Sequence, residues 1–256
     1  VTVPALSTGS SGDPLGRVGA GIAAEPRRFT ALQLEERRRT LGPVLFAAVF
    51  QQDPNAMGGG MFDRAMWGSV DFDPVDALFF VRAWDLAGGG ADATAAVLLA
   101  VTGGGQLVIA DILHERLEVV DVRRRLVEVS EADRDTWGRH AAVTQVVEQQ
   151  PGASGKDQAL TISELVRGVE FMAPSGSKEA RAYAASARQL EGDLYISESI
   201  PKSKIDELVR ETDAFPGGRH DDLCDALAYA INWALFRARP RRRARIITPA
   251  AIRIAS

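Results

Sequence analysis

The stretch ALFFVRAWDLAGGGADATAAVLLAVTGGGQLVIADILHE, residues 77–115, decides the expected fold. It contains three β-prone runs, separated by glycine-rich segments at Gly88–Gly90 and Gly103–Gly105. Short glycine turns between such runs are typical of an antiparallel meander. The first run is apolar on both faces and ends at Asp85, which favours a central strand.

Downstream of the meander, helical and strand patterns alternate. Further strands are expected at 141–150, 169–174 and 194–197, and helices at 117–135, 156–168, 177–192 and 203–212, with Ser177 as the cap of the third helix. A meander followed by alternating elements predicts an α/β fold, with a mixed sheet flanked by helices. We expect about five strands in this sheet.

The segment before the meander has a different composition. Residues 1–30 are rich in Gly, Pro, Ser and Ala, which predicts a loop. A helix is expected to follow, with Thr30 as its N-cap and Gly42 as its end. We divide the chain into a partly irregular linker segment, 1–70, a folded domain, 71–240, and a basic tail, 241–256.

Bulk composition excludes several classes of protein. The chain of 256 residues has one cysteine, Cys224, which excludes an internal disulfide framework and fits a reducing compartment. It contains neither a signal peptide nor an apolar run long enough to span a membrane, so no membrane partner is expected. A net charge of −4 does not itself indicate nucleic-acid binding, although a local basic face would suffice. The first residue is not Met, which suggests a fragment or a processed chain.

Two acids stand at the ends of predicted strands. Asp85 ends the first strand of the meander, and Glu148 ends the strand VTQVVE before a Pro/Gly turn. Active sites of α/β proteins commonly lie in the crevice beyond strand ends. The alternatives are that Asp85 binds its own glycine turn and that Glu148 faces solvent.

A third acidic feature lies in FPGGRHDDLCDALAYAINWAL, residues 215–235. Asp221, Asp222 and Asp225 crowd the start of a helix that is otherwise almost wholly apolar. Aspartate is a favoured N-cap, and this explains one of the acids, most naturally Asp221. Three acids at the mouth of a buried helix indicate a bound cation.

Carboxylates gathered from two strands and a helix favour a divalent metal site. They would repel one another and raise each other's pKa unless a metal compensates them. Oxygen ligands suit Mg²⁺ or Mn²⁺, and two ions about 4 Å apart can clamp both oxygens of a phosphoryl displacement. The three histidines, His114, His140 and His220, have no zinc-ligand spacing, and no serine has the sequence of a nucleophile elbow.

Several basic residues are candidates for DNA contacts. The stretch QPGASGKDQ, 150–158, is too short for a phosphate loop and has Asp157 where Ser or Thr is needed, so no nucleotide motor is expected. Lys156 could still contact a DNA phosphate, or the stretch is a plain strand-to-helix turn. The tail RARPRRRAR, 237–245, carries six arginines and either grips the DNA backbone or is a solvated extension. The candidate contacts are Lys156, Arg219, Arg241, Arg242 and Arg243.

These motifs resemble the nuclease domain of the large terminase subunit of tailed bacteriophages. FFVRAWDLAGGGADAT resembles its first catalytic strand, VVEQQPGASGKDQ its second acidic segment, and FPGGRHDDLCDALAYA its closing motif, the most specific of the three. DPLGR, LGPVLFAAVFQQDP and GGGMF resemble the stretch that joins the family's ATPase to its nuclease. The resemblance therefore covers most of the chain.

The resemblance implies a ribonuclease H-like fold and a two-metal endonuclease that cuts double-stranded viral DNA concatemers during packaging. Asp85, Glu148 and Asp222 or Asp225 would hold two Mg²⁺ or Mn²⁺ ions, one activating water and one stabilising the leaving 3′ oxygen. The implied partners are DNA, the small terminase subunit and the portal, in the host cytoplasm. The family's intact protein begins with an ATPase, which this sequence lacks, so the chain is expected to be a C-terminal portion or a prophage remnant.

Two other hypotheses fit the residues. The domain could be a catalytically idle DNA-binding or docking module of a packaging complex. It could also be another ribonuclease H-like nuclease, of the resolvase or transposase type.

Overall fold

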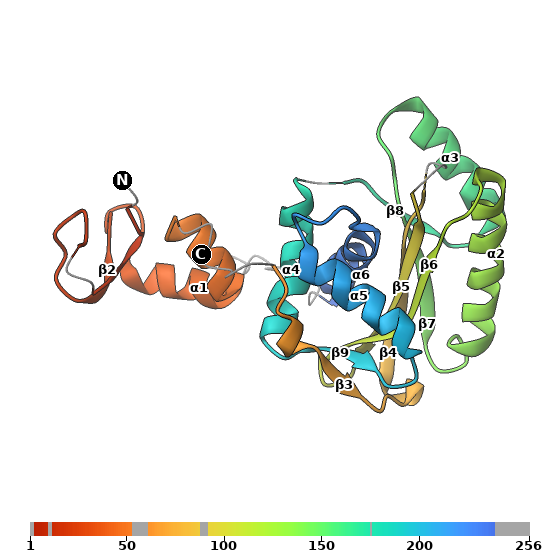
Figure 1. The fold of residues 1–256 in the computed structure, drawn as a ribbon, viewed down its shortest axis with the longest axis horizontal. Coiled ribbons are helices and arrows are strands. Elements are labelled where there is room, and N and C mark those ends of the chain that lie inside the picture. Colours follow the sequence, from red (N-terminus) through yellow and green to blue (C-terminus); the bar gives the residue numbers. More distant parts are fainter. Residues whose placement is uncertain (1–2, 10–11, 53–60, 88–91, 175, 239–256) are drawn as a thin grey trace, which may run out of the picture.

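The computed structural model describes residues 3–9, 12–52, 61–87, 92–174 and 176–238. Its main part is a mixed seven-stranded sheet with helices on both faces (Figure 1). The strand order is β3-β9-β6-β5-β4-β7-β8.

The meander forms the centre of the sheet. β4 (Ala77–Asp85), β5 (Thr94–Thr102) and β6 (Leu107–Glu115) pair antiparallel in chain order. β7 (Ala142–Glu148) pairs parallel with β4, and β8 (Glu170–Met172) pairs parallel with β7. On the other side, β9 (Leu194–Ser197) pairs parallel with β6. The mixed sheet expected from the sequence is confirmed.

The expected number of five strands is too low, because the six strands expected individually are all in the sheet and β3 makes a seventh. β3 (Gly68–Val70), which pairs parallel with β9, has no counterpart among the expected strands. It is three residues long and only half-buried, so it has no period-two apolar pattern for sequence reasoning to detect.

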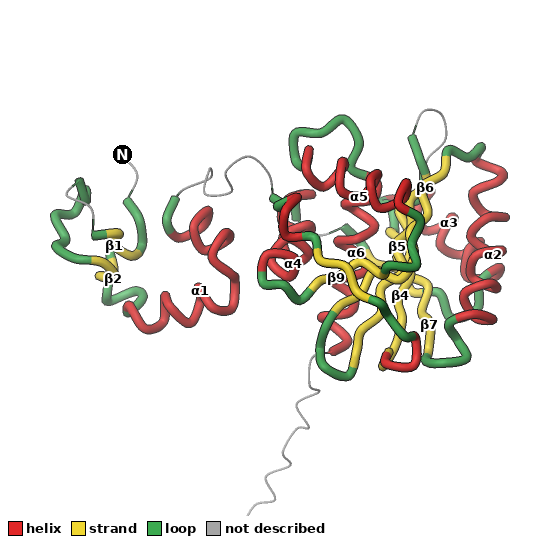
Figure 2. The backbone as a smooth tube through the Cα atoms, turned by 60° about the horizontal axis from the view of Figure 1, so that its bottom comes forward, coloured by secondary structure: helices red, strands yellow, loops and turns green. Residues whose placement is uncertain are grey.

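Helices cover the sheet in two layers, which Figures 1 and 2 show from two directions. α2 (Val119–Thr136) and α3 (Gly152–Leu165) pack on one face, against Trp84 and Val147. α4 (Lys178–Leu190), α5 (Lys202–Ala214) and α6 (Asp222–Ala238) cover the other face. As expected, Ser177 caps α4, since its hydroxyl accepts from the amide of Ala180.

α6 is the most deeply buried of the described helices. Residues 223–231 of this helix are all buried, and they share one core cluster with Val81 and Ala83 of β4 and with Ala182 and Ala185 of α4. A helix that is apolar all round needs partners on most sides. Here the sheet, α4 and α5 supply them, so the start of α6 is held in a fixed place.

Residues 3–9 and 12–52 contain a small structured unit. The hairpin of β1 (Leu6–Thr8) and β2 (Ala20–Ala23) precedes α1 (Ala31–Leu45), which continues into a π-helical turn, Phe46–Phe50. The expectation of a loop over 1–30 is therefore wrong at β1 and β2, where Leu6 and Ala23 are buried with Leu34 and Phe46.

The expected N-terminus of α1 is confirmed, and its expected end is wrong. The amide of Gln33 donates to the hydroxyl of Thr30, as an N-cap requires. The helix does not end at Gly42, because a glycine inside a helix costs only about 1 kcal/mol. Burial of Phe46 beyond that point favours continuation.

The sheet unit begins before residue 70. Met61 and Phe62 are buried in the core cluster that also contains α6, and two short 3₁₀ helices, Arg64–Met66 and Pro74–Asp76, flank β3. A domain boundary before Met61 would keep β3 with its sheet.

No helix among the described residues is long and apolar enough to cross a membrane.

A buried ionic network joins β4 to α2. Arg82 Nε and Nη2 donate to the two carboxylate oxygens of Asp133 at 2.6 and 2.7 Å, and both residues are 2% exposed. Gln145 Nε2 also donates to Asp133, at 2.8 Å, and Trp84 Nε1 donates to Gln145 Oε1 at 2.8 Å. Arg82 Nη2 reaches Asp111 at 3.0 Å. The network thus ties β4, β6, β7 and α2 together.

The substitution Asp133→Ala is expected to lower the free energy of unfolding by about 3–5 kcal/mol, because it leaves the buried Arg82 guanidinium without its main partner. Urea denaturation followed by circular dichroism measures this loss. The control is Asp206→Asn, which removes the acid of an exposed pair with Lys202 and should cost less than about 1 kcal/mol. Equal losses in the two variants would contradict the role given to the network.

Candidate metal centre

A row of four residues crosses one end of the sheet: Glu148 on β7, Asp85 on β4, Ala95 on β5 and His114 on β6. Asp85 pairs with Ala95, and Ala95 pairs with His114. The last paired residues of the parallel strands β4 and β7 precede Asp85 and Glu148, so these two acids stand side by side. Directly opposed residues point to the same face of a sheet, so the row shares one face.

The face in question is the one that α6 covers. Side chains alternate along a strand, and Val81 and Ala83 of β4 belong to the core cluster that contains α6. Asp85, two residues further on, therefore points toward α6. Val146 belongs to the same cluster, so Glu148 also points there.

The first turn of α6 brings its acids to this row. Asp225 is 3% exposed, and its amide donates to the carbonyl of Asp221 at 2.8 Å, which places Asp221 at the N-cap position. The amide of Leu223 is capped from α5 instead, by Glu211 Oε2 at 2.9 Å. Thus a glutamate from another helix satisfies part of the helix start.

The acids influence one another strongly. The pKa of Asp85 is raised to about 8, first by burial and then by the negative charges of Glu148, Asp225 and Asp222. Lys178 opposes this rise only in part. Negative charges on separate elements therefore act on Asp85, as expected from the sequence.

Cations of α4 neutralise the α6 acids on one side. Lys178 Nζ lies 2.8 Å from each carboxylate oxygen of Asp221 and 3.2 Å from Asp225. Arg181 Nη2 donates to the other oxygen of Asp225 at 3.1 Å, and its guanidinium lies over the ring of Tyr229. The carboxylate of Asp221 is thus turned toward Lys178.

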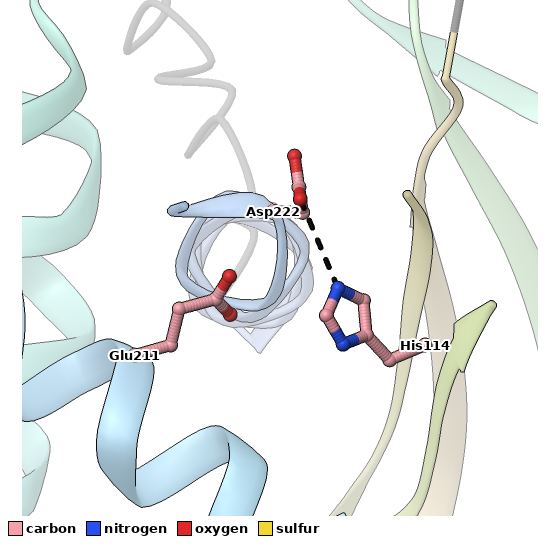
Figure 3. A group of neighbouring side chains, drawn as sticks. All are labelled: His114, Glu211 and Asp222. Carbon is pink, nitrogen blue, oxygen red and sulfur yellow. Dashed lines mark ion pairs between the residues drawn. The ribbon is translucent and has the colours of Figure 1, made fainter. Parts of the chain in front are cut away.

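Asp222 faces a different set of side chains. His114, Glu211 and Asp222, here called the histidine group, offer ligand atoms that lie within 4.8 Å of one another (Figure 3). His114 Nε2 lies 3.8 Å from Asp222 Oδ2, an ion-pair distance that is too long for a hydrogen bond. The sequence analysis found no zinc-ligand spacing for His114, and the fold places it beside Glu211 and Asp222, which are far from it in the chain.

Both titratable partners in this group have shifted pKa values. The neighbouring carboxylate of Asp222 raises the pKa of His114, although burial works against it. Burial raises the pKa of Glu211, and the charge of His114 opposes this. His114 and Glu211 therefore bind protons more readily than the same side chains would in water.

The acidic group, Asp85, Glu148 and Asp225, has the donor chemistry that suits a hard divalent cation, but among the described residues only the histidine group brings three ligand atoms within 4.8 Å of one another. Its donors are all carboxylate oxygens, which Mg²⁺ and Mn²⁺ prefer. The raised pKa of Asp85 reflects negative charge that the neighbouring lysine does not fully compensate. A cation would relieve the repulsion that causes the shift.

The predicted basic contacts are only partly placed by the structure. Lys156 is exposed on α3, which follows directly after β7. Arg219 is exposed and lines a cavity of about 290 Å³ together with His114, Glu211 and Asp222. Arg241, Arg242 and Arg243 lie outside the described residues.

The glycines near Lys156 have a local structural role. A Cβ atom on Gly155 would lie 1.9 Å from the carbonyl oxygen of Gln150, so only glycine fits where α3 starts close to the end of β7. This explains the glycine in QPGASGKDQ as part of a tight strand-to-helix turn. A contact between Lys156 and DNA stays a prediction.

Sequence reasoning missed four residues of this region: His114, Glu211, Lys178 and Arg181. One signal for His114 was present, because it lies one residue before the end of the third strand of a meander whose first strand ends at Asp85. Reading the register across the meander would have placed the two residues in one row. No comparable signal marks Glu211, which lies in a helix of mixed polarity.

The sequence matches one family model, described as the terminase RNase H-like domain, over residues 82–233. The matched range contains the acidic group, the histidine group and the whole row across the sheet. No curated protein matches the chain.

Solved structures with a similar fold include the large terminase of a thermophilic bacteriophage, with a TM-score of 0.56 and 15% identity over 80% of this chain and 53% of that one. The human cytomegalovirus terminase nuclease domain has a TM-score of 0.50 and 14% identity over 64% and 87% of the two chains. A nuclease domain from the large terminase subunit of bacterial virus Sf6, solved with manganese and beta-thujaplicinol, has a TM-score of 0.50 and 12% identity over 67% and 98%. At these identities the likeness concerns the fold.

Without metal, the protein is expected to lose stability as the pH rises from about 5 to about 8. The folded-state pKa of Asp85, about 8, exceeds the ordinary value, so the folded state holds a proton that the unfolded state has already released. The raised pKa values of His114 and Glu211 act in the same direction. Each such proton contributes at most about 1.4 kcal/mol per pH unit.

Urea denaturation in EDTA across this pH range measures the effect. Asp85→Asn should show a shallower decline, since its side chain cannot titrate. Asp135→Asn, an exposed acid on α2, should keep the parent slope. A stability that rises with pH in the parent protein would contradict the charge arrangement described for the site.

Proposed function

The chain belongs to the family of terminase RNase H-like domains, and on this premise we propose that it is a divalent-metal-dependent DNA endonuclease. It would be the nuclease portion of a terminase large subunit and would cut double-stranded viral DNA concatemers during packaging. The observation that carries the proposal is the position of Asp85 at one end of the sheet, where the negative charges of Glu148, Asp225 and Asp222 raise its pKa.

In this proposal the four acids hold two Mg²⁺ or Mn²⁺ ions. Such ions, when bound, activate a water molecule and stabilise the leaving oxygen of a phosphodiester. Asp85 and Glu148 extend from buried strands, so their carboxylates are held in place before any ligand binds. Lys178 and Arg181 fix the carboxylate of Asp225 from the side of α4. Asp221 would act as the helix cap and as a partner of Lys178.

DNA would be held mainly through its backbone. Arg219 lines the cavity beside the histidine group, and Lys156 is exposed on α3 next to the strand that carries Glu148. Arginines 241, 242 and 243 of the tail would add contacts to phosphates. Backbone contacts position a duplex without reading its sequence, so little sequence preference follows.

The remaining assignments follow from the family. We assign residues 1–70 to a segment that joins an upstream ATPase to the nuclease, 71–240 to the nuclease, and 241–256 to the basic tail. The burial of Met61 and Phe62 favours including residues 61–70 with the nuclease. The proposed partners are duplex DNA, the small terminase subunit and the portal, and the proposed location is the host cytoplasm.

Asp85→Asn is expected to lower the rate of Mn²⁺-dependent plasmid cleavage by about 1000-fold, because a metal site supplies several kcal/mol of charge stabilisation to the transition state. Conversion of supercoiled plasmid to nicked and linear forms measures the rate. Asp135→Asn, on the opposite face of the sheet, should cleave at the parent rate. Cleavage by Asp85→Asn at the parent rate would refute the nuclease assignment.

Metal titration separates this proposal from an idle DNA-binding module. Calorimetry of the parent protein should show saturable Mn²⁺ binding that Asp85→Asn and Glu148→Gln each weaken. An idle module would show no binding that depends on these residues. A preference for branched over linear duplex would instead indicate an enzyme of the resolvase type.

Arg219→Ala is expected to weaken duplex binding and to reduce the slope of log K against log salt by about 0.9, the contribution of one phosphate contact. Fluorescence anisotropy with a labelled duplex at several salt concentrations measures both quantities. Arg124→Ala, at an exposed position of α2, is the matched control and should leave the slope unchanged. Equal slopes for the parent and Arg219→Ala would remove Arg219 from the proposed interface.

A further inference from the structure

The histidine group contains buried polar atoms that lack a protein partner. Glu211 is 7% exposed, and its Oε1 has no hydrogen-bond partner among the described residues, whereas Oε2 accepts from Leu223. Nε2 of His114 is also buried without a hydrogen-bond partner in the same part of the chain. Buried polar atoms without partners are costly and uncommon, so they indicate a ligand that satisfies both.

The surroundings of His114 resemble those of a metal-binding imidazole. Nε2 is directed toward Asp222 (Figure 3). Glu207 Oε2 lies 3.6 Å from Nδ1, the other nitrogen of the ring. Histidines that bind metals commonly have a carboxylate or carbonyl near the nitrogen that does not bind the ion. The ring is thus oriented with one nitrogen toward the group and one toward an acid.

The group also opens onto a cavity. His114, Glu211 and Asp222 all line the cavity of about 290 Å³, and Arg116, Arg210 and Arg219 line it as well. An ion held by the three ligands would therefore keep access to solvent, and the arginines would admit an anionic ligand such as a phosphate. Lys178 and Arg181 contact Asp221 and Asp225, whereas the charge of Asp222 faces the histidine.

We propose that His114, Glu211 and Asp222 form a divalent transition-metal site of their own, which prefers Mn²⁺, Co²⁺ or Zn²⁺ to Mg²⁺. Imidazole nitrogen binds first-row transition metals well, whereas Mg²⁺ favours oxygen ligands and retains its waters. The acidic group, with oxygen donors only, lacks this preference for nitrogen-binding ions. The inference rests on the proposed function only through Asp222, which is a candidate ligand in both.

The chain offers a direct spectroscopic test, because it has only three histidines. Ring-proton NMR of the full chain in excess Mg²⁺, with Zn²⁺ added, should shift the signals of His114 and leave those of His140 in place. Co²⁺ added under the same conditions should give visible absorption bands from one bound equivalent. His114→Gln and Glu211→Gln should each weaken this binding by at least about tenfold, since even the loss of a supporting residue costs that much.

The variants are chosen to preserve the fold. Glu211→Gln keeps an oxygen that can accept from the amide of Leu223, and His114→Gln keeps a polar side chain of similar reach. Thermal unfolding in EDTA checks that both remain folded. His140→Gln, an exposed histidine near the end of α2, is the matched control and should bind Co²⁺ as the parent does.

The outcomes separate this inference from the proposed function. Unchanged Co²⁺ binding by folded His114→Gln in excess Mg²⁺ overturns the inference, and loss of cleavage in Asp85→Asn would still support the nuclease. Loss of Co²⁺ binding in His114→Gln, with binding retained in Asp85→Asn, supports a separate site. If Asp85→Asn then also cleaved DNA at the parent rate, the proposed function would fall and the histidine site would stand.

Discussion

The chemistry of the proposed metal site depends on repulsion between Asp85 and the carboxylates that the fold places around it. Asp225 is buried, and its negative charge, together with that of Glu148, raises the pKa of Asp85. Burial of Asp85 adds to this rise, because it makes the charged form costly. The α4 cations Lys178 and Arg181 offset the charge of Asp225. A divalent ion at this end of the sheet would relieve the same repulsion, which is the basis of the proposed metal site.

The opposite face of the sheet supplies the rigidity that this arrangement needs. Arg82 stands on β4 three residues before Asp85, and its pairing with Asp133 ties the strand to α2. Gln145 joins β7, the strand of Glu148, to the same network. The strands that carry the two acids are therefore held by this network on the α2 face of the sheet, and α6 packs on the other face. Preorganised ligands of this kind do not have to be ordered when an ion binds.

The row across the sheet divides into two chemically different halves. Asp85 and Glu148 offer oxygen at one end, and His114 offers nitrogen at the other, with the small side chain of Ala95 between them. α6 contributes one aspartate to each half, Asp225 to the first and Asp222 to the second. Because residues 222 and 225 are one helical turn apart, a single helix serves both halves.

Local signals in the sequence determined the meander, the strand ends at Asp85 and Glu148, the Ser177 cap and the apolar helix after the three aspartates. Periodicity, glycine turns and capping act over a few residues, so they can be read without the fold. The tertiary structure alone decided that β3 joins the sheet, that Asp221 turns to Lys178, and that Asp222 meets His114 and Glu211. These contacts join residues far apart in the chain, and the packing of α4, α5 and α6 on the sheet sets the direction of each side chain. The sequence placed three acids at the mouth of a helix, and packing paired Asp221 and Asp225 with cations of α4 and Asp222 with His114.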